Sequence, residues 1–297
     1  MIELRPVESE ADLTAWAEIK SRVVPNEPVT VEQLRASLEP DRLLLLAALD
    51  GVLSGCGIAD RSSFGGRAFI AARVLPEHRG LGVGSMLVQA LAGHAARLGL
   101  TGVNAFVYAD EPGSIAFAEK LGLAEVDYQL EQIRQVRPGL EAQPAPVEGV
   151  EVRSLAGARE ELLERVWPLA LAGYADMPLP GEVTYEQKSW LREEATRPEG
   201  SFIALCAGEP VGFAGLREHA NGAAMAEHGL TVVRRDQRGR GIARLLKRSQ
   251  LAWAAGAGVA DLVTWTQKGN EAMQALNRSL GYLDASKVIV FQGPLPG

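Results

Sequence analysis

A short glycine-rich string occurs twice in this chain, as RGLGVG at residues 79–84 and as RGRGIA at residues 238–243. Three pairs of residues keep an offset of 159 positions along the chain: Arg79 and Arg238, Gly99 and Gly258, and Gly122 and Gly281. An ordered series of matches at one offset indicates an internal duplication. The chain is therefore expected to fold as two copies of one unit.

The two copies differ in length only ahead of the glycine string. The offset falls to 154 between TVEQ at 30–33 and TYEQ at 184–187, and to 148 between Arg5 and Arg153. The second copy thus carries extra residues upstream of its glycine string. A Thr followed three residues later by Gln is a capping-box pattern, which predicts that a helix begins at this point in both copies.

Hydrophobic periods and turn residues predict the same order of elements in each copy. In the first copy we expect strands over 2–5, 43–49, 52–60, 69–74, 103–108 and 124–134, and helices over 12–23, 31–38, 82–98 and 114–121. Antiparallel strands come first, and a strand–helix–strand crossover follows the glycine string. This order predicts an α/β fold of the α+β type, with a mixed sheet in each half.

Length and composition set the domain plan. A chain of 297 residues is long enough for two domains, which we place at 1–137 and 150–297. Residues 138–149 between them contain three prolines and are expected to form a linker.

Charge and hydropathy exclude several classes of partner. The formal net charge is −7, which disfavours binding to nucleic acid or to an anionic membrane surface. No apolar run is long enough to span a bilayer, and the N-terminus lacks the pattern of a signal peptide, so a cytoplasmic location is expected. Cys56 and Cys206 lie in apolar runs and are interpreted as buried side chains, so neither a disulfide nor a metal site is expected.

The glycine strings have the composition of an anion site. A strand that leads through glycines into a helix presents free backbone N–H groups and the positive end of the helix dipole. The strings lack the G-x-G-x-x-G order of a dinucleotide site and the Gly-Lys-Ser/Thr ending of a P-loop. In their sequence context they resemble the acetyl-CoA motif of the GNAT superfamily of N-acetyltransferases. The chain is similar over its whole length to tandem GNAT proteins of the mycothiol synthase type, and NxxMxxxNxxxGY at 270–282 strengthens this resemblance.

The resemblance implies that both strings hold the pyrophosphate of CoA. The cofactor-binding residues that it implies in the second half are Leu230, Thr231, Val232, Val233, Arg238, Gly239, Arg240, Gly241, Ile242, Ala243 and Asn270. Those that it implies in the first half are Val74, Arg79, Gly80, Leu81, Gly82, Val83 and Gly84. Further basic residues near the second string either contact CoA phosphates or form a solvated helix face.

Two catalytic residues follow from the same resemblance. Glu227, eleven residues before Arg238, occupies the position where related proteins place a carboxylate that faces the amine. Asn277 stands where the family usually has a tyrosine acid, and its amide is expected to donate a hydrogen bond to the CoA sulfur. By the 159-residue offset, the counterparts of Glu227 and Asn277 in the first half are Ala68 and Ala118, so that half is expected to be catalytically degenerate.

Other assignments leave alternatives open. Strand alternation places His228 on the face opposite Glu227, so we interpret it as a packing residue. The segment 174–182 is either a wall of the acceptor site, through Tyr174, Asp176 and Glu182, or an exposed loop.

The sequence as a whole predicts an acetyl-CoA-dependent N-acetyltransferase. We expect a primary amine of a small molecule or peptide to attack acetyl-CoA directly in a ternary complex, with the second half catalytic. The partners expected are acetyl-CoA and the amine, with the protein a monomer or homodimer. Two alternatives remain: a non-catalytic CoA-binding sensor or scaffold, and a transferase of a longer acyl group.

Overall fold

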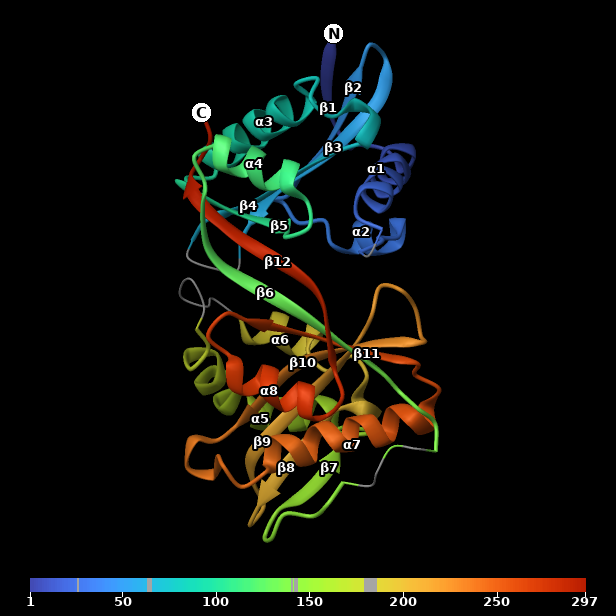
Figure 1. Ribbon diagram of the computed structural model, residues 1–297, viewed down its shortest axis with the longest axis vertical. Coiled ribbons are helices and arrows are strands. Elements are labelled where there is room, and N and C mark those ends of the chain that lie inside the picture. Colours follow the sequence, from blue (N-terminus) through green and yellow to red (C-terminus); the bar gives the residue numbers. More distant parts are fainter. Residues whose placement is uncertain (26, 63–65, 140, 142–143, 179–185) are drawn as a thin grey trace. The chain divides into compact units, whose positions relative to one another are not determined.

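The computed structural model describes residues 1–25, 27–62, 66–139, 141, 144–178 and 186–297 (Figure 1). Contacts divide the chain into two packed units, one made of Met1–Tyr128 with Val288–Gly297 and the other of Gln129–Lys287. Among the described residues, no helix is both long enough and apolar enough to cross a membrane. Each unit has a mixed sheet covered by helices, which confirms the fold class predicted from the sequence.

The first unit builds its sheet around one parallel crossover. The strands in spatial order are β1 (Ile2–Pro6), β2 (Leu43–Leu49), β3 (Val52–Arg61), β4 (Ala68–Val74), β5 (Gly102–Tyr108) and the end of β12 (Leu283–Pro294). The helices are α1 (Glu10–Val23), α2 (Val31–Ala36), α3 (Val83–Arg97) and α4 (Pro112–Lys120), with the 3₁₀ turn η1 (Pro76–His78). Among the described strands of this unit, only β4 and β5 run parallel, because α3 carries the chain back across the sheet between them.

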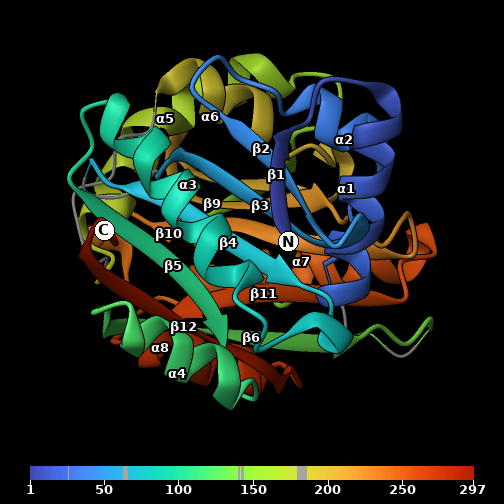
Figure 2. The same ribbon diagram turned by 90° about the horizontal axis from the view of Figure 1, so that it is seen from above.

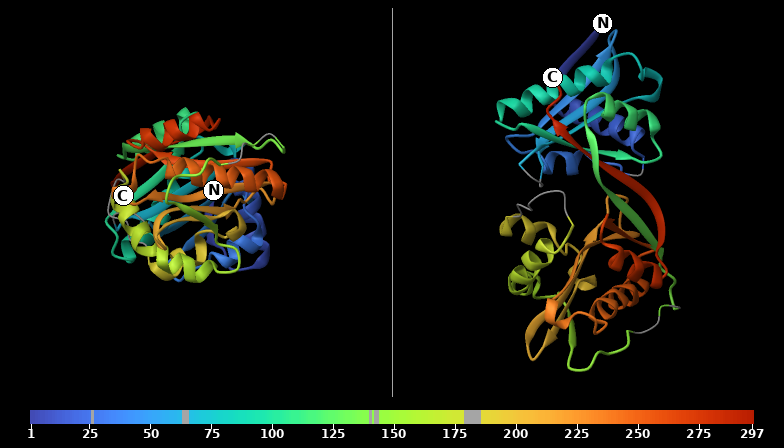
Figure 3. Two further views of the ribbon diagram at one scale, coloured as in Figure 1. Left: turned by 90° about the horizontal axis from the view of Figure 1, so that it is seen from below. Right: turned by 60° about the vertical axis from the view of Figure 1, so that its left-hand side comes forward.

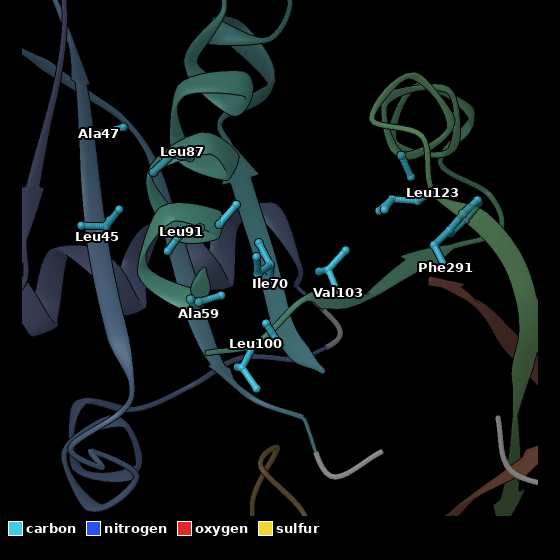
Figure 4. Close-up of a cluster of buried hydrophobic side chains, with 14 of the residues drawn as sticks. Leu45, Ala47, Ala59, Ile70, Leu87, Leu91, Leu100, Val103, Leu123 and Phe291 are labelled. Atoms are coloured by element: carbon cyan, nitrogen blue, oxygen red, sulfur yellow. The ribbon is translucent and has the colours of Figure 1, made fainter. Parts of the chain in front are cut away.

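Strand alternation gives this sheet two apolar faces. Leu45 and Ala59 pack with α3 and α4 on one face, whereas Leu46 and Cys56 pack with α1 and α2 on the other. Figure 2 shows α3 lying across the strands. In Figure 4, Leu87 and Leu91 of α3 lie over side chains of β2, β3 and β4, whereas Phe291 of β12 lies beside Leu123, just after α4. The predicted helix start at Thr30 is confirmed by a capping box with Gln33; Thr184 lies outside the described residues.

The second unit repeats this topology. Its strands in spatial order are β7 (Glu151–Ser154), β8 (Phe202–Cys206), β9 (Glu209–Glu218), β10 (Met225–Val233), β11 (Asp261–Gln267) and the end of β6 (Ala124–Gln135). The helices are α5 (Arg159–Ala175), α6 (Gln187–Glu193), α7 (Ile242–Ala257) and α8 (Glu271–Ser279), with the 3₁₀ turns η2 (Pro198–Gly200) and η3 (Arg235–Gln237). Helices α5 and α7 lie on opposite faces of the sheet, as the left-hand view of Figure 3 shows.

The last strand of each half completes the sheet of the other half. Residues 129–135 of β6 pair antiparallel with β11, and residues 288–294 of β12 pair antiparallel with β5. The red end of β12 can be followed beside β5 in Figure 1. The packed units therefore divide the chain differently from the sequence repeat, whose first copy contains all of 124–134. Neither half of the sequence contains a complete sheet of its own.

This exchange predicts that the second half alone is not a stable domain. Residues 150–297 expressed alone should lack a cooperative unfolding transition, because β11 loses its partner over Asp261–Gln267 and exposes an unpaired edge. Residues 124–297, which retain β6, should regain the transition. Urea unfolding followed by circular dichroism measures both; equal unfolding midpoints for the two fragments would contradict the prediction.

Candidate functional site

Both glycine strings have one backbone geometry. Gly80 and Gly82 have φ angles of 78° and 89°, and Gly239 and Gly241 have φ angles of 79° and 87°. This left-handed region strains any residue with a Cβ, which explains the glycines. Gly82 and Gly241 are the N-caps of α3 and α7 and supply no side-chain cap, so the first turn of each helix keeps N–H groups for a ligand.

The arginine that begins each string turns back toward its own strand. Arg79 Nε donates to the Val74 carbonyl oxygen at 3.3 Å, and Arg238 Nε donates to the Val233 carbonyl oxygen at 3.0 Å. The guanidinium of Arg79 also pairs with Glu111, and that of Arg238 with Asp176. These two residues therefore fix the loop on the strand end rather than extend toward the helix N-terminus.

The strands that precede the glycine strings separate from their parallel neighbours. Among the described residues, β10 pairs with β11 only over Met225–Glu227, and β4 pairs with β5 only at Ala68 and Phe69. The rest of each strand, including residues 230–233, has no described parallel partner on the edge that faces β11 or β5. Each unit thus offers parted strands that lead toward a glycine loop.

A β-bulge in β10 distinguishes the second unit from the first. The pairing of β10 with β9 shifts register between His228 and Thr231, whereas β4 pairs with β3 without a shift. The bulge moves the counterpart of Glu227 by one position. Glu227 pairs with Arg217, and the equivalent pair in the first unit is Phe69 with Asp60. The structural counterpart of Glu227 is therefore Phe69, and the prediction of Ala68 from the constant offset is wrong.

Glu227 is the last residue of β10 that pairs with β11. Its carboxylate forms a short ion pair with Arg217 on β9, and the Glu227 side chain remains 25% exposed. An acceptor can therefore reach it.

A second carboxylate, which the sequence analysis missed, lies beside this pair. Glu194 follows α6, is 4% exposed, and accepts a hydrogen bond from the Leu230 backbone N–H at 3.1 Å. A Cβ at Gly215 or Gly229 would collide with this carboxylate, so both strands need glycine there. Burial raises the pKa of Glu194 to about 7; Arg217 opposes the shift and Glu227 adds to it. The two glycines within β9 and β10 were the available sequence signal.

Asn277 is fully buried and is held by a residue from the first half of the sequence. Its Nδ2 donates to Gln132 Oε1 at 2.9 Å, and Gln132 Nε2 donates to Asp284 Oδ1 at 2.8 Å. Among the described residues, Asn277 Oδ1 has no hydrogen-bond partner. Gln132 was missed because it belongs to the exchanged strand β6. Asn270 lies nearby in sequence, as the N-cap residue of α8.

The α7 face of this sheet buries further polar groups. His228 Nε2 and the Tyr282 hydroxyl lie 2.6 Å apart, and Lys247 Nζ lies 5.4 Å from the Tyr282 ring centroid. Lys247 Nζ is buried without a hydrogen-bond partner among the described residues, and burial lowers its pKa to about 7. Burial also holds the pKa of His228 well below its usual value, so the imidazole is neutral.

The first unit fills the equivalent positions with apolar side chains. The counterparts of Gln132, His228, Lys247, Gln250, Asn277 and Tyr282 are Phe291, Ile70, Val88, Leu91, Ala118 and Leu123. Most of these residues belong to the apolar core shown in Figure 4. The same fold thus has a polar interior in the second unit and an apolar one in the first.

The charged residues around the second glycine string mostly pair with one another. Arg235 and Arg238 both bind Asp176 and hold its pKa below the usual range, and Arg234 binds Asp236. Asp176 is therefore occupied by arginines rather than open to an amine. Of the other residues in the predicted acceptor wall, Tyr174 accepts a hydrogen bond from the indole of Trp190, and Glu182 lies outside the described residues.

Replacement of the buried lysine should stabilise the protein. The pKa of Lys247 is about 7 in the folded state against an ordinary 10.5, so the unfolded state binds the proton more tightly between these values. Wild-type stability should rise with pH across this window. Lys247→Met should raise the free energy of unfolding at pH 7 by a few kcal/mol (order of magnitude), and its advantage should shrink toward pH 10.

Urea unfolding at pH 7 and at pH 10 measures this difference. Lys268→Met, which replaces an exposed lysine just after β11, is the matched control and should change little. A destabilised Lys247→Met variant, or an advantage that does not change with pH, would refute the expectation.

Comparison with known proteins agrees with this geometry. The model of the Acetyltransferase (GNAT) family matches residues 11–123 and 163–282. The chain is 27% identical over 291 residues to a mycothiol acetyltransferase from Kocuria rhizophila, with 91% of each chain covered. It is 28% identical over 221 residues to a mycothiol acetyltransferase from Thermobispora bispora, with 70% of each covered.

Solved structures share the fold over the whole length of the chain. A GCN5-related N-acetyltransferase from Sphaerobacter thermophilus superposes with a TM-score of 0.80 at 20% identity, covering 100% of this chain and 96% of that one. A tandem GNAT protein from the clavulanic acid biosynthesis pathway gives 0.77 at 19% identity, covering 100% and 99%. The chain therefore belongs to the acetyltransferase (GNAT) family, as a tandem protein that transfers an acetyl group from acetyl-CoA to an amine.

Proposed function

We propose that the second half alone performs the transfer, with Glu227 as the base. The observation that supports this most strongly is the bulge in β10, which puts Glu227 on the same face as Glu194 at the point where β10 and β11 part. The first unit has neither the bulge nor a carboxylate at the equivalent position. The two halves share a CoA-binding framework, and only one carries acid–base groups beside it.

The residues proposed for acetyl-CoA follow the parted edge of β10 into α7. The helix N-terminus and the backbone of residues 239–243 would hold the pyrophosphate, because their N–H groups lack intrahelical partners. The free edge of residues 230–233 would hold the pantetheine arm, with Asn270 and Asn277 at α8 on its other side. The first glycine string, residues 79–84, is proposed to bind CoA without chemistry.

The reaction proposed is direct attack in a ternary complex. The amine nitrogen bonds to the thioester carbon, the carbon–sulfur bond breaks, and CoA leaves as a thiolate that takes up a proton. Glu227, directly or through one water, accepts the proton that the amine loses. Burial raises the pKa of the Cys56 thiol to about 12, and Cys206 lies on β8, so neither cysteine suits a covalent route.

The relatives suggest the class of acceptor. Because they are mycothiol acetyltransferases, we propose an amine related to mycothiol, acetylated in the cytoplasm by a monomer or homodimer. A face lined by Glu227 and Glu194 favours a cationic amine over an anionic acceptor.

Loss of the base should slow the transfer without weakening acetyl-CoA binding. Glu227→Gln should lower kcat/KM by about 10²- to 10⁴-fold, because the amide cannot accept the proton. Thiol release from acetyl-CoA in the presence of a panel of amines measures the rate, and calorimetry measures acetyl-CoA binding. Glu209→Gln, at the exposed start of β9, is the control. Equal rates for Glu227→Gln and wild type with every amine would refute the role.

Glu194 should give the activity a pH dependence. Above about pH 7 its carboxylate gains a charge on the face proposed for the cationic amine, which favours binding of that amine. The ratio of kcat/KM between wild type and Glu194→Gln should therefore rise about three- to tenfold from pH 6 to pH 8. Glu193→Gln, an exposed neighbour paired with Arg192, should give a ratio independent of pH. A flat ratio for Glu194→Gln would count against this coupling.

A further inference from the structure

The first unit contains a partly buried arginine whose charge is not balanced locally. Arg73 lies on β4 directly opposite Cys56 of β3, on the face covered by α1. Its guanidinium carbon is 5.8 Å from the ring centroid of Trp16. Among the described residues, Arg73 forms no ion pair, and its buried Nη1 atom has no hydrogen-bond partner. A buried guanidinium without an acceptor is costly, because arginine does not lose its proton to escape burial.

A second cation lies on the same face. Lys20 follows Trp16 by one turn of α1, and its side chain is 12% exposed. Lys20 Nζ lies 3.9 Å from Glu27 Oε2, and Glu27 Oε1 accepts a hydrogen bond from the Tyr108 hydroxyl at 2.5 Å. Burial lowers the pKa of Lys20, and the charge of Arg73 lowers it further.

Among the described groups that interact with Arg73 and Lys20, the charges sum to one positive charge in excess. Helix α1 contributes Lys20, the segment after it contributes Glu27, and β4 contributes Arg73. Cys56 of β3 stays a neutral thiol because burial raises its pKa, and Tyr108 of β5 is a hydroxyl bound to Glu27. One carboxylate therefore cannot neutralise both cations.

The cations lie where the strands of the first unit separate. Arg73 and Tyr108 are near the ends of β4 and β5, beyond the last parallel pair at Phe69 and Asn104. The equivalent positions of Arg73 and Cys56 in the second unit are Val232 and Phe213, both in an apolar cluster under α5. The fold itself therefore does not require a cation here.

We propose that the first half binds a carboxylate-bearing small molecule at Arg73 and Lys20, on the α1 face beside the parted ends of β4 and β5. A single carboxylate has the charge that balances this face, and its two oxygens match the planar donors of the guanidinium. The site is the charge-inverted counterpart of the Glu227 and Glu194 face in the second unit. It does not depend on the acetyl transfer proposed there.

The carboxylate has two chemical sources. It is either the acid end of an acyl group on a CoA held by the first glycine string, or a free carboxylic acid. Calorimetry on the full chain at pH 7 separates them with two probes: carboxymethyl-CoA, a stable thioether compared with CoA itself, and succinate. Inorganic phosphate is the third probe, for an oxyanion of higher charge.

The proposal predicts that carboxymethyl-CoA binds at least about tenfold more tightly than CoA, or that succinate binds measurably. In either case Arg73→Met should abolish the carboxylate-dependent affinity and leave the binding of CoA unchanged. Arg22→Met, which replaces an exposed arginine on α1, the helix that carries Lys20, is the matched control and should bind like wild type. If Arg73→Met does not fold, Lys20→Met tests the same site and should weaken carboxylate binding at least about threefold.

Three results would overturn the proposal. The first is that carboxymethyl-CoA binds no more tightly than CoA and succinate does not bind. The second is that carboxylate affinity persists unchanged in the Arg73 or Lys20 variant. The third is that phosphate binds in an Arg73-dependent manner more tightly than either carboxylate.

Discussion

The one extra residue that β10 carries opposite β9 decides which side chains of the second unit share a face. Side chains alternate between the faces of a sheet, so a bulge between His228 and Thr231 changes the face of every residue before it relative to those after it. It turns Glu227 toward Glu194 and buries His228 under α7. Glu194 in turn accepts the N–H of Leu230 within the bulge, and two glycines leave room for its carboxylate. The face on which Glu227 lies and the room for Glu194 thus depend on one irregularity in strand pairing, whereas the strands part in both units.

The two units share one fold but differ in the polarity of the interior between sheet and helix. The interior under α3 is apolar, whereas the interior under α7 buries a lysine, a histidine, a tyrosine and amides. Burying polar groups costs free energy unless they are fully paired, and Lys247 is not paired among the described residues. Because the apolar arrangement is compatible with the same topology, the fold does not require the polar one.

Charge separates the two halves in the same way. On the face covered by α5, the second unit carries the carboxylates of Glu227 and Glu194 with Arg217 between strands. On the equivalent face under α1, the first unit carries Arg73 and Lys20 with Glu27. A cationic amine suits the charges of the second unit, and an anion suits those of the first unit. The repeat therefore conserves backbone geometry, while the two faces for which we propose ligands differ in the sign of their charge.

The sequence by itself determined the features that are local in the chain. The duplication, the order of elements, the placing of each glycine string between a strand and a helix, and the capping box at Thr30 all depend on residues close in sequence, so they could be predicted. Tertiary structure alone decided three others: the exchange of β6 and β12, the strand register that replaces Ala68 by Phe69 as the counterpart of Glu227, and the contacts of Glu194 and Gln132. These depend on pairing between strands far apart in the chain, and a repeat looks the same whether its last strand joins its own sheet or its partner's.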